Sequence, residues 1–155
     1  MKNEFMDYEV LKQVERELMF VLKEEYSFYQ SLYIMLDKQR DLIKYDRDEH
    51  LLDLFAEIER NRSRIKKSEE KIAGLKERHP QAFQMVTLMP EVKKVVNSIV
   101  TLVKKNMDLV AECDNYLRGR YERIKAELGE LQNSQKILQY LRSADPSPQF
   151  VDGKQ

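Results

Sequence analysis

Constellations that could form a catalytic or metal site are scarce in this 155-residue sequence, which contains two histidines, one cysteine and four glycines. A di-iron site in a helical bundle needs a Glu three residues before each ligating His. Arg47 stands there before His50, and Lys76 stands there before His79. The glycines are isolated from one another, so no phosphate-binding loop of the Walker or Rossmann type is present. The sequence therefore predicts a protein that is not an enzyme and has no cofactor or metal site.

Cys113 and Asn106 lie on the apolar stripe of a predicted helix, at spacings typical of core positions. A buried cysteine behaves as a small apolar residue, and a buried asparagine can fix the register of packed helices. We therefore expect Cys113 to be a core residue instead of a reactive thiol, and Asn106 to set helix register. A single cysteine excludes an internal disulfide, which agrees with a reducing compartment.

Basic and acidic residues balance, with 27 of each, so net charge gives no argument for a nucleic-acid or anionic-membrane partner. The basic run Arg60–Lys67 could contact phosphates, but Glu57, Glu59, Glu69 and Glu70 surround it. Opposite charges at helical spacing pair with one another. We interpret the run as a solvated helix face, and keep a nucleic-acid-binding module as an alternative that depends on it.

No segment is apolar enough to span a membrane, because the longest segments without a charge run to about eleven residues and a span needs about 20. The first ten residues have neither the basic nor the apolar region of a signal peptide. We therefore expect a cytoplasmic protein without membrane insertion.

The fold expected is all-α, an elongated antiparallel helical bundle or coiled coil of long helices. Apolar residues recur at spacings of three and four, in helical tracts at about 4–78 and 91–143 that are joined by a loop at 79–90. The two tracts form a single domain over 1–143, and 144–155 is a flexible C-terminal tail. The apolar stripe changes phase at 44–50, which implies a stutter or a break. Because no Gly or Pro stands there, a continuous first helix is favoured.

A continuous first helix would be about 110 Å long against about 80 Å for the second, at 1.5 Å per residue. Folding them back on each other places three pairs of residues together: Leu75 with Val92, Ile58 with Leu109, and Phe28 with Gln139. The apolar residues before about position 25 would then overhang. We expect them to dimerise, to fold back through the irregularity at 44–50, or to receive a partner helix.

Two further apolar groups have open interpretations. The aromatic residues Tyr26, Phe28, Tyr29 and Tyr33 are expected to pack between helices, with a groove for a partner as the alternative. The segment 81–89 is unusually apolar for a loop. It either plugs the end of the bundle or offers an apolar patch to a partner.

The order of leucines and polar residues along both tracts is similar to that of a known family. The first tract carries Glu25…Leu32…Leu36…Gln39…Leu42…Asp46…Leu54…Ile58-Glu59, and the second carries Leu102…Lys105-Asn106…Leu109 before a long polar helix. The sequence ends in Pro148-Gln149-Phe150-Val151-Asp152-Gly153-Lys154-Gln155. Together these resemble the FlgN-type flagellar export chaperones, which are small helical cytoplasmic proteins.

The resemblance implies a chaperone in bacterial flagellum assembly that acts without catalysis. Such chaperones bind the two hook–filament junction proteins, keep the terminal helices of these clients from assembling early, and deliver them to the export gate and ATPase components of the flagellar type III export apparatus. The resemblance places client binding in the C-terminal helical part, here about 115–143. Within it we expect the apolar anchors to be Leu128, Leu131, Ile137, Leu138, Tyr140 and Leu141.

Each of these anchors has an alternative role in packing within the molecule. The sequence also fits a coiled-coil scaffold or adaptor that pairs with a second copy of itself and has no chaperone role, so a homodimer is kept open.

Overall fold

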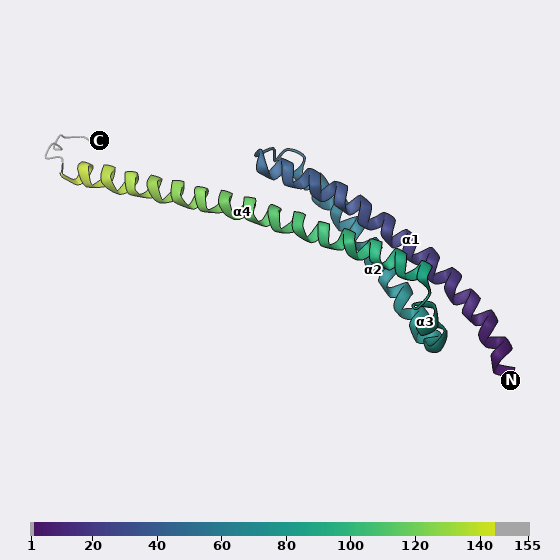
Figure 1. Ribbon diagram of the computed structural model, residues 1–155. Coiled ribbons are helices and arrows are strands. Elements are labelled where there is room, and N and C mark those ends of the chain that lie inside the picture. The colour runs from purple at the N-terminus through teal and green to yellow at the C-terminus, as the bar shows by residue number, and fades with distance from the viewer. Residues whose placement is uncertain (1, 145–155) are drawn as a thin grey trace. The chain divides into compact units, whose positions relative to one another are not determined.

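The computed structural model describes residues 2–144, and all of its regular structure is helical (Figure 1). The helices are α1 (Lys2–Lys44), α2 (Leu51–Arg78), α3 (Pro80–Val86) and α4 (Pro90–Ala144). The all-α bundle predicted from the sequence is therefore present. The C-terminal tail expected at 144–155 lies, from residue 145 on, outside the described residues.

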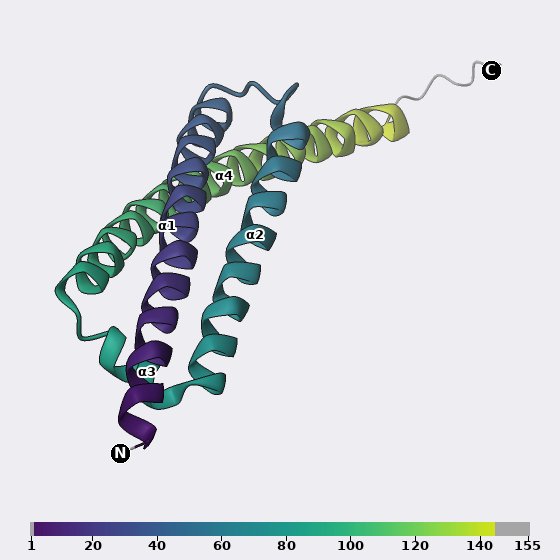
Figure 2. The same cartoon turned by 90° about the vertical axis from the view of Figure 1, so that its right-hand side faces the viewer.

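The chain divides into two units, Met1–Asp114 and Asn115–Gln155, with the boundary inside α4. The sequence predicts one domain over 1–143 instead. In the first unit, α1, α2 and the part of α4 before residue 115 pack together, and α3 contacts both α1 and α2 at one end (Figure 2). The second unit is described here by itself, as the remaining part of α4.

Contacts between side chains give the helix directions in the first unit. Lys71 lies 3.7 Å from Glu24, and Arg78 lies 3.8 Å from Glu17. Residue numbers therefore increase along α1 in the direction in which they decrease along α2, so the two helices are antiparallel. Helices α1 and α4 run parallel. Asn106 of α4 contacts the Tyr29 carbonyl of α1, and Glu112, further along α4, contacts Arg40, further along α1.

The core of the first unit consists of two apolar clusters. The cluster nearer α3 contains Val14, Leu18, Leu22, Leu75, Val86, Val92 and Ile99. The cluster nearer the α1–α2 turn contains Leu32, Leu36, Leu54, Ile58, Ile65 and Leu109. Two expected neighbour pairs, Leu75 with Val92 and Ile58 with Leu109, each share a cluster.

The prediction of a continuous first helix is wrong, because α1 ends at Lys44 and the chain then reverses direction before α2 begins at Leu51. The amide of Arg47 donates to the Leu42 carbonyl at 2.8 Å, and the amide of Asp46 donates to the Ile43 carbonyl at 3.2 Å. Asp46 has a φ of 55°. This is a Schellman motif with Asp in the left-handed position that Gly usually occupies. The break is therefore invisible to a search for Gly and Pro.

The reversal removes the overhang predicted for the start of the chain. Val14, Leu18, Val21 and Leu22 are buried, which is the second of the three outcomes expected for them. The predicted pairing of Phe28 with Gln139 depended on a continuous first helix, which the structure does not contain. The Phe28 carbonyl instead accepts a hydrogen bond from Asn61 of α2.

The prediction of a loop at 79–90 is also wrong for its first part, because Pro80–Val86 forms α3. Pro80 stands at the start of this helix, where its missing N–H costs nothing. Val86 is fully buried, and Ala82 and Phe83 pack against the cluster nearer α3. Met85 and Leu88 remain exposed. The segment thus both closes the bundle end and leaves two apolar side chains on the surface.

The left-handed residue in the α1–α2 turn gives the first prediction. Asp46→Val should lower the free energy of unfolding by about 1–2 kcal/mol, because a left-handed conformation is costly for a β-branched side chain. Asp46→Asn, which tolerates this conformation, should change it by only a few tenths of a kcal/mol. Urea unfolding followed by circular dichroism measures both. Equal stability of the two variants would contradict the role given to this turn.

Candidate helix-binding surface

The part of α4 in the second unit carries a row of exposed apolar side chains. They recur at alternating spacings of four and three, which are the a and d positions of a heptad repeat. Gln135 occupies the one polar a position between them. We call this row the distal stripe; it consists of Leu117, Tyr121, Ile124, Leu128, Leu131 and Leu138.

All six anchors expected from the sequence lie on the surface. Leu128, Leu131 and Leu138 belong to the distal stripe, whereas Ile137, Tyr140 and Leu141 lie beside its end. Each of the six exposes more than half of its surface, from 54% at Leu128 to 73% at Tyr140. The six side chains are exposed in this unit, and their role as anchors or in packing within the molecule stays a prediction.

The charges beside the distal stripe cancel only in its C-terminal part, because Arg118, Arg120 and Arg123 stand against Glu122 alone before Ile124. Between Ile124 and Leu141 the chain has Lys125 and Lys136 against Glu127 and Glu130. A partner bound between Ile124 and Leu141 would be held mainly by burial of apolar surface, and this contribution to affinity depends little on salt.

Cys113 and its surroundings in the first unit confirm the expected core role. The residue is buried, and its Sγ donates a hydrogen bond to Gln39 Oε1 at 3.6 Å. Burial raises the pKa of the Cys113 thiol, although the nearby Arg40 opposes the shift. The thiol is thus held in its protonated, less reactive form.

Arg40 links α1 to α4 through a cluster of carboxylates. Its guanidinium lies 2.7 Å from Asp37, 3.2 Å from Asp41 and 3.2 Å from Glu112. The hydrogen bond to Glu112 is the main cause of the raised Arg40 pKa. Because the pairs are largely exposed to solvent, they orient the helices more than they stabilise them.

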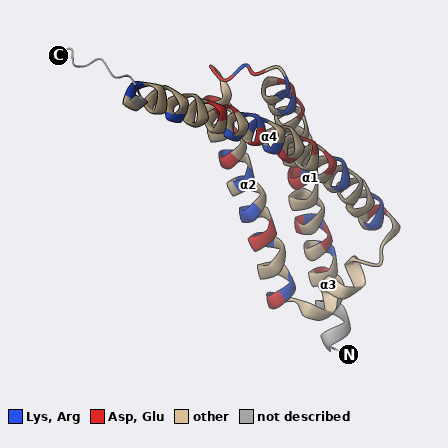
Figure 3. Ribbon diagram, turned by 90° about the vertical axis from the view of Figure 1, so that its left-hand side faces the viewer, with Lys and Arg blue, Asp and Glu red and all other residues tan. Residues whose placement is uncertain are grey.

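The basic run Arg60–Lys67 lies on α2 among acidic residues. Figure 3 shows basic and acidic segments alternating along this helix. Arg62 lies 3.9 Å from Glu59, while Asn61 and Ile65 of the same run are buried. The arrangement agrees with a solvated helix face whose inner side packs into the core.

The aromatic group of α1 packs between helices, as expected. Tyr26 and Tyr29 contact the cluster nearer α3, and Phe28, Tyr29 and Tyr33 contact the cluster nearer the turn.

His50 and His79 stand at helix ends. Among the described residues, no three His, Cys, Asp or Glu side chains gather where they could hold a metal ion. No helix in that part of the chain combines the length and apolarity needed to cross a membrane.

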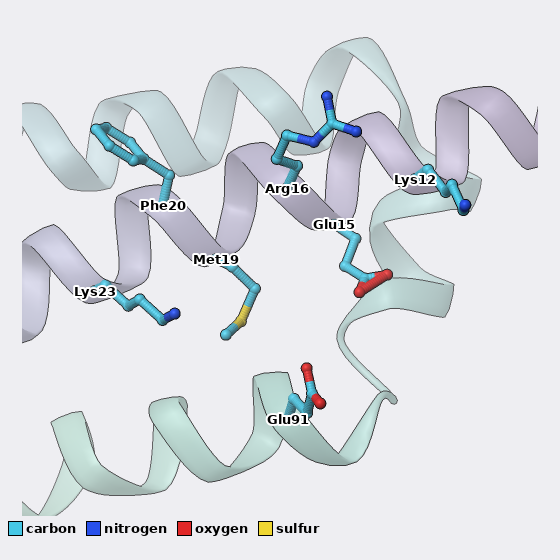
Figure 4. A pocket seen from close by; sticks show the side chains of 7 residues that line it. All are labelled: Lys12, Glu15, Arg16, Met19, Phe20, Lys23 and Glu91. Atoms are coloured by element: carbon cyan, nitrogen blue, oxygen red, sulfur yellow. The ribbon is translucent and has the colours of Figure 1, made fainter.

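A hollow of about 560 Å³ lies between α1 and the start of α4 (Figure 4). Met19 and Glu15 point from α1 toward α4, and Glu91 points back from α4. Its basic residues Lys12, Arg16 and Lys23 nearly balance Glu15 and Glu91. No buried polar atom without a partner lines this hollow among the described residues.

Glu25 is a buried carboxyl that the sequence did not single out as titratable. It exposes only 7% of its surface, and its Oε2 has no hydrogen-bond partner among the described residues. Burial, and secondarily the charge of Glu69 on α2, raise the Glu25 pKa to about 7. The available signal was a glutamate within an otherwise apolar stripe.

Comparison with models of known families, with curated proteins and with solved structures finds no match for this chain. The interpretation of the distal stripe therefore depends on its chemistry and on the sequence resemblance.

Glu25 gives a prediction of pH dependence. The Glu25 pKa is raised in the folded protein, so the folded state favours the neutral carboxyl. The stability that this gives is complete below about pH 4.5 and is lost as the pH rises through about 7. The shift corresponds to roughly 3 kcal/mol. Glu25→Gln should therefore remove most of the fall in stability between pH 5 and pH 8. Urea unfolding at several pH values measures this.

The matched control is Glu9→Gln, which changes an exposed glutamate of the same helix. It should leave the pH dependence unchanged. A Glu25→Gln variant whose stability still falls as in the parent chain would show that another group is responsible.

Proposed function

We propose that this chain is a helix-binding protein whose distal stripe receives an amphipathic helix of a client. One observation carries the proposal: six apolar side chains at heptad spacing are exposed on α4. Exposed apolar surface of this extent is typical of an interaction site. A helical client could place its own apolar face against the stripe, in the way amphipathic helices bind apolar grooves.

The energetics suit a reversible complex. Burying one large aliphatic side chain contributes roughly 1.5–3 kcal/mol. A client segment that is disordered when free loses conformational entropy as it orders on the stripe, and this offsets part of the gain. While the client is bound, its apolar face is covered and cannot assemble with other copies. The net affinity remains low enough for release to a later partner.

We infer the identity of the client from the sequence resemblance to the FlgN-type chaperones. On this basis the chain is a cytoplasmic FlgN-type chaperone that binds the terminal helices of hook–filament junction proteins and delivers them to the export gate. The same heptad spacing also suits a second copy of this chain. A self-associating scaffold is therefore the competing function.

The client surface gives a third prediction. Leu138→Asp with Leu141→Asp should abolish the complex that forms when the chain is co-expressed with a hook–filament junction protein. The two charges would be buried in the apolar interface without partners. Affinity capture followed by size-exclusion chromatography measures the complex, which is expected at a one-to-one or similar ratio.

The matched control is Leu52→Asp with Leu88→Asp, two exposed leucines of the first unit, and it should bind the client normally. Normal binding by a well-folded Leu138→Asp, Leu141→Asp variant would show that the distal stripe is not the site. A stable dimer by light scattering, with no complex on co-expression, would favour the scaffold.

A further inference from the structure

A groove of about 440 Å³ lies within the first unit and involves none of the distal stripe. Residues of α1, α2 and α4 line it. They are Tyr29, Leu32 and Leu36 from α1, Arg62 from α2, and Val103, Asn106, Met107, Val110, Ala111 and Asp114 from α4.

The groove has an apolar floor and an exposed apolar wall. Leu32 and Leu36 of α1 are buried and form the floor. On α4, Met107 is 65% exposed and Val110 is 42% exposed. The lining residues follow helical spacing, three and four along α1 and four and three along α4, which matches the ridges of a further packed helix.

Asn106 gives the groove a polar point. The residue is only 4% exposed, and its Nδ2 donates to the Tyr29 carbonyl at 3.3 Å. Its Oδ1 has no hydrogen-bond partner among the described residues. A buried acceptor without a donor destabilises the folded protein. Because Oδ1 itself has almost no exposed surface, a donor on a bound helix would satisfy it only after the lining side chains shift to open it.

We propose that this groove binds one amphipathic helix of a partner protein, which packs apolar side chains on Leu32, Leu36 and Met107 and offers an uncharged hydrogen-bond donor to Asn106. Gln, Asn, Ser or Thr would supply the donor. The lining has one basic residue, Arg62, and one acidic residue, Asp114, so its charge does not favour a charged helix face. The proposal goes beyond the client role of the distal stripe and does not depend on it.

Two synthetic peptides test the proposal. One is a 21-residue helical peptide with leucine at the a and d positions and a single central glutamine, and its twin has leucine in place of the glutamine. Each is titrated into the full ¹⁵N-labelled chain. We expect the glutamine peptide to shift the Asn106 side-chain amide signals saturably and to bind more tightly than its twin. The absence of a saturable shift with the glutamine peptide would overturn the proposal.

Met107→Glu should weaken binding of the glutamine peptide at least tenfold, because a charge would face the apolar side of the bound helix. The matched control Met85→Glu changes an exposed methionine of α3 and should bind as the parent chain does. Since Met107 is exposed, its replacement should leave the fold intact. Equal weakening by both variants, or by neither, would overturn the proposal.

Asn106→Leu removes the unpartnered acceptor and should reverse the preference, so that the all-leucine twin binds more tightly. An unchanged preference in a folded Asn106→Leu variant would exclude the hydrogen bond. If this variant does not fold, the comparison of Met107→Glu with Met85→Glu decides.

The Leu138→Asp, Leu141→Asp variant separates this groove from the proposed client surface. It should bind the glutamine peptide normally. Loss of binding in this variant would place the peptide on the distal stripe, which would overturn the groove proposal and leave the client proposal standing. A dimer of the chain alone that Met107→Glu dissociates would assign the groove to a second copy instead of a partner.

Discussion

Two asparagines hold the three long helices of the first unit at one relative register. Asn61 of α2 donates to the Phe28 carbonyl at 2.6 Å, and Asn106 of α4 donates to the Tyr29 carbonyl at 3.3 Å. These carbonyls belong to successive residues of α1, so the middle of α1 is contacted from both neighbours. Apolar side chains tolerate sliding of one helix along another far better than a buried amide does, because the amide loses its partner. The rest of the packing is built around this contact.

The same region separates the two apolar clusters. Glu25, Ser68 and Asn106 are buried polar residues, one on each helix, and in each helix they lie between residues of the two clusters. Burial of a carboxyl costs stability whenever it is charged, and Glu25 carries that cost near neutral pH. Specific alignment of helices is obtained here with some loss of stability.

The two units use apolar residues differently. In the first unit three helices and α3 surround a shared core, so apolar residues at core spacing are buried. The described residues of the second unit form one helix, and no other described element of that unit covers its apolar face. The leucines of the distal stripe are exposed, and we propose that a partner covers them. On that proposal, stability and recognition belong to separate parts of one chain.

Helical periodicity, the absence of Gly and Pro before Gly74, and the position of Cys113 on an apolar stripe were enough to predict an all-α bundle and a buried thiol. The apolar residues near the C-terminal end of α4 could also be placed on one helix from their local spacing, and their role as anchors stays a prediction. Whether they are covered depends on what else lies beside that helix. Local pattern carries no such information.

The sequence by itself thus determined that the chain is helical and where most apolar residues face, since both follow from interactions between residues three and four apart. Only the tertiary structure decided that the first tract reverses at Asp46, that Pro80–Val86 forms α3, and which helices meet. A left-handed Asp leaves no distinctive residue type in the sequence. The burial of Val86 and the contacts of Asn61 and Asn106 join residues far apart in the chain, and they exist only once the helices pack.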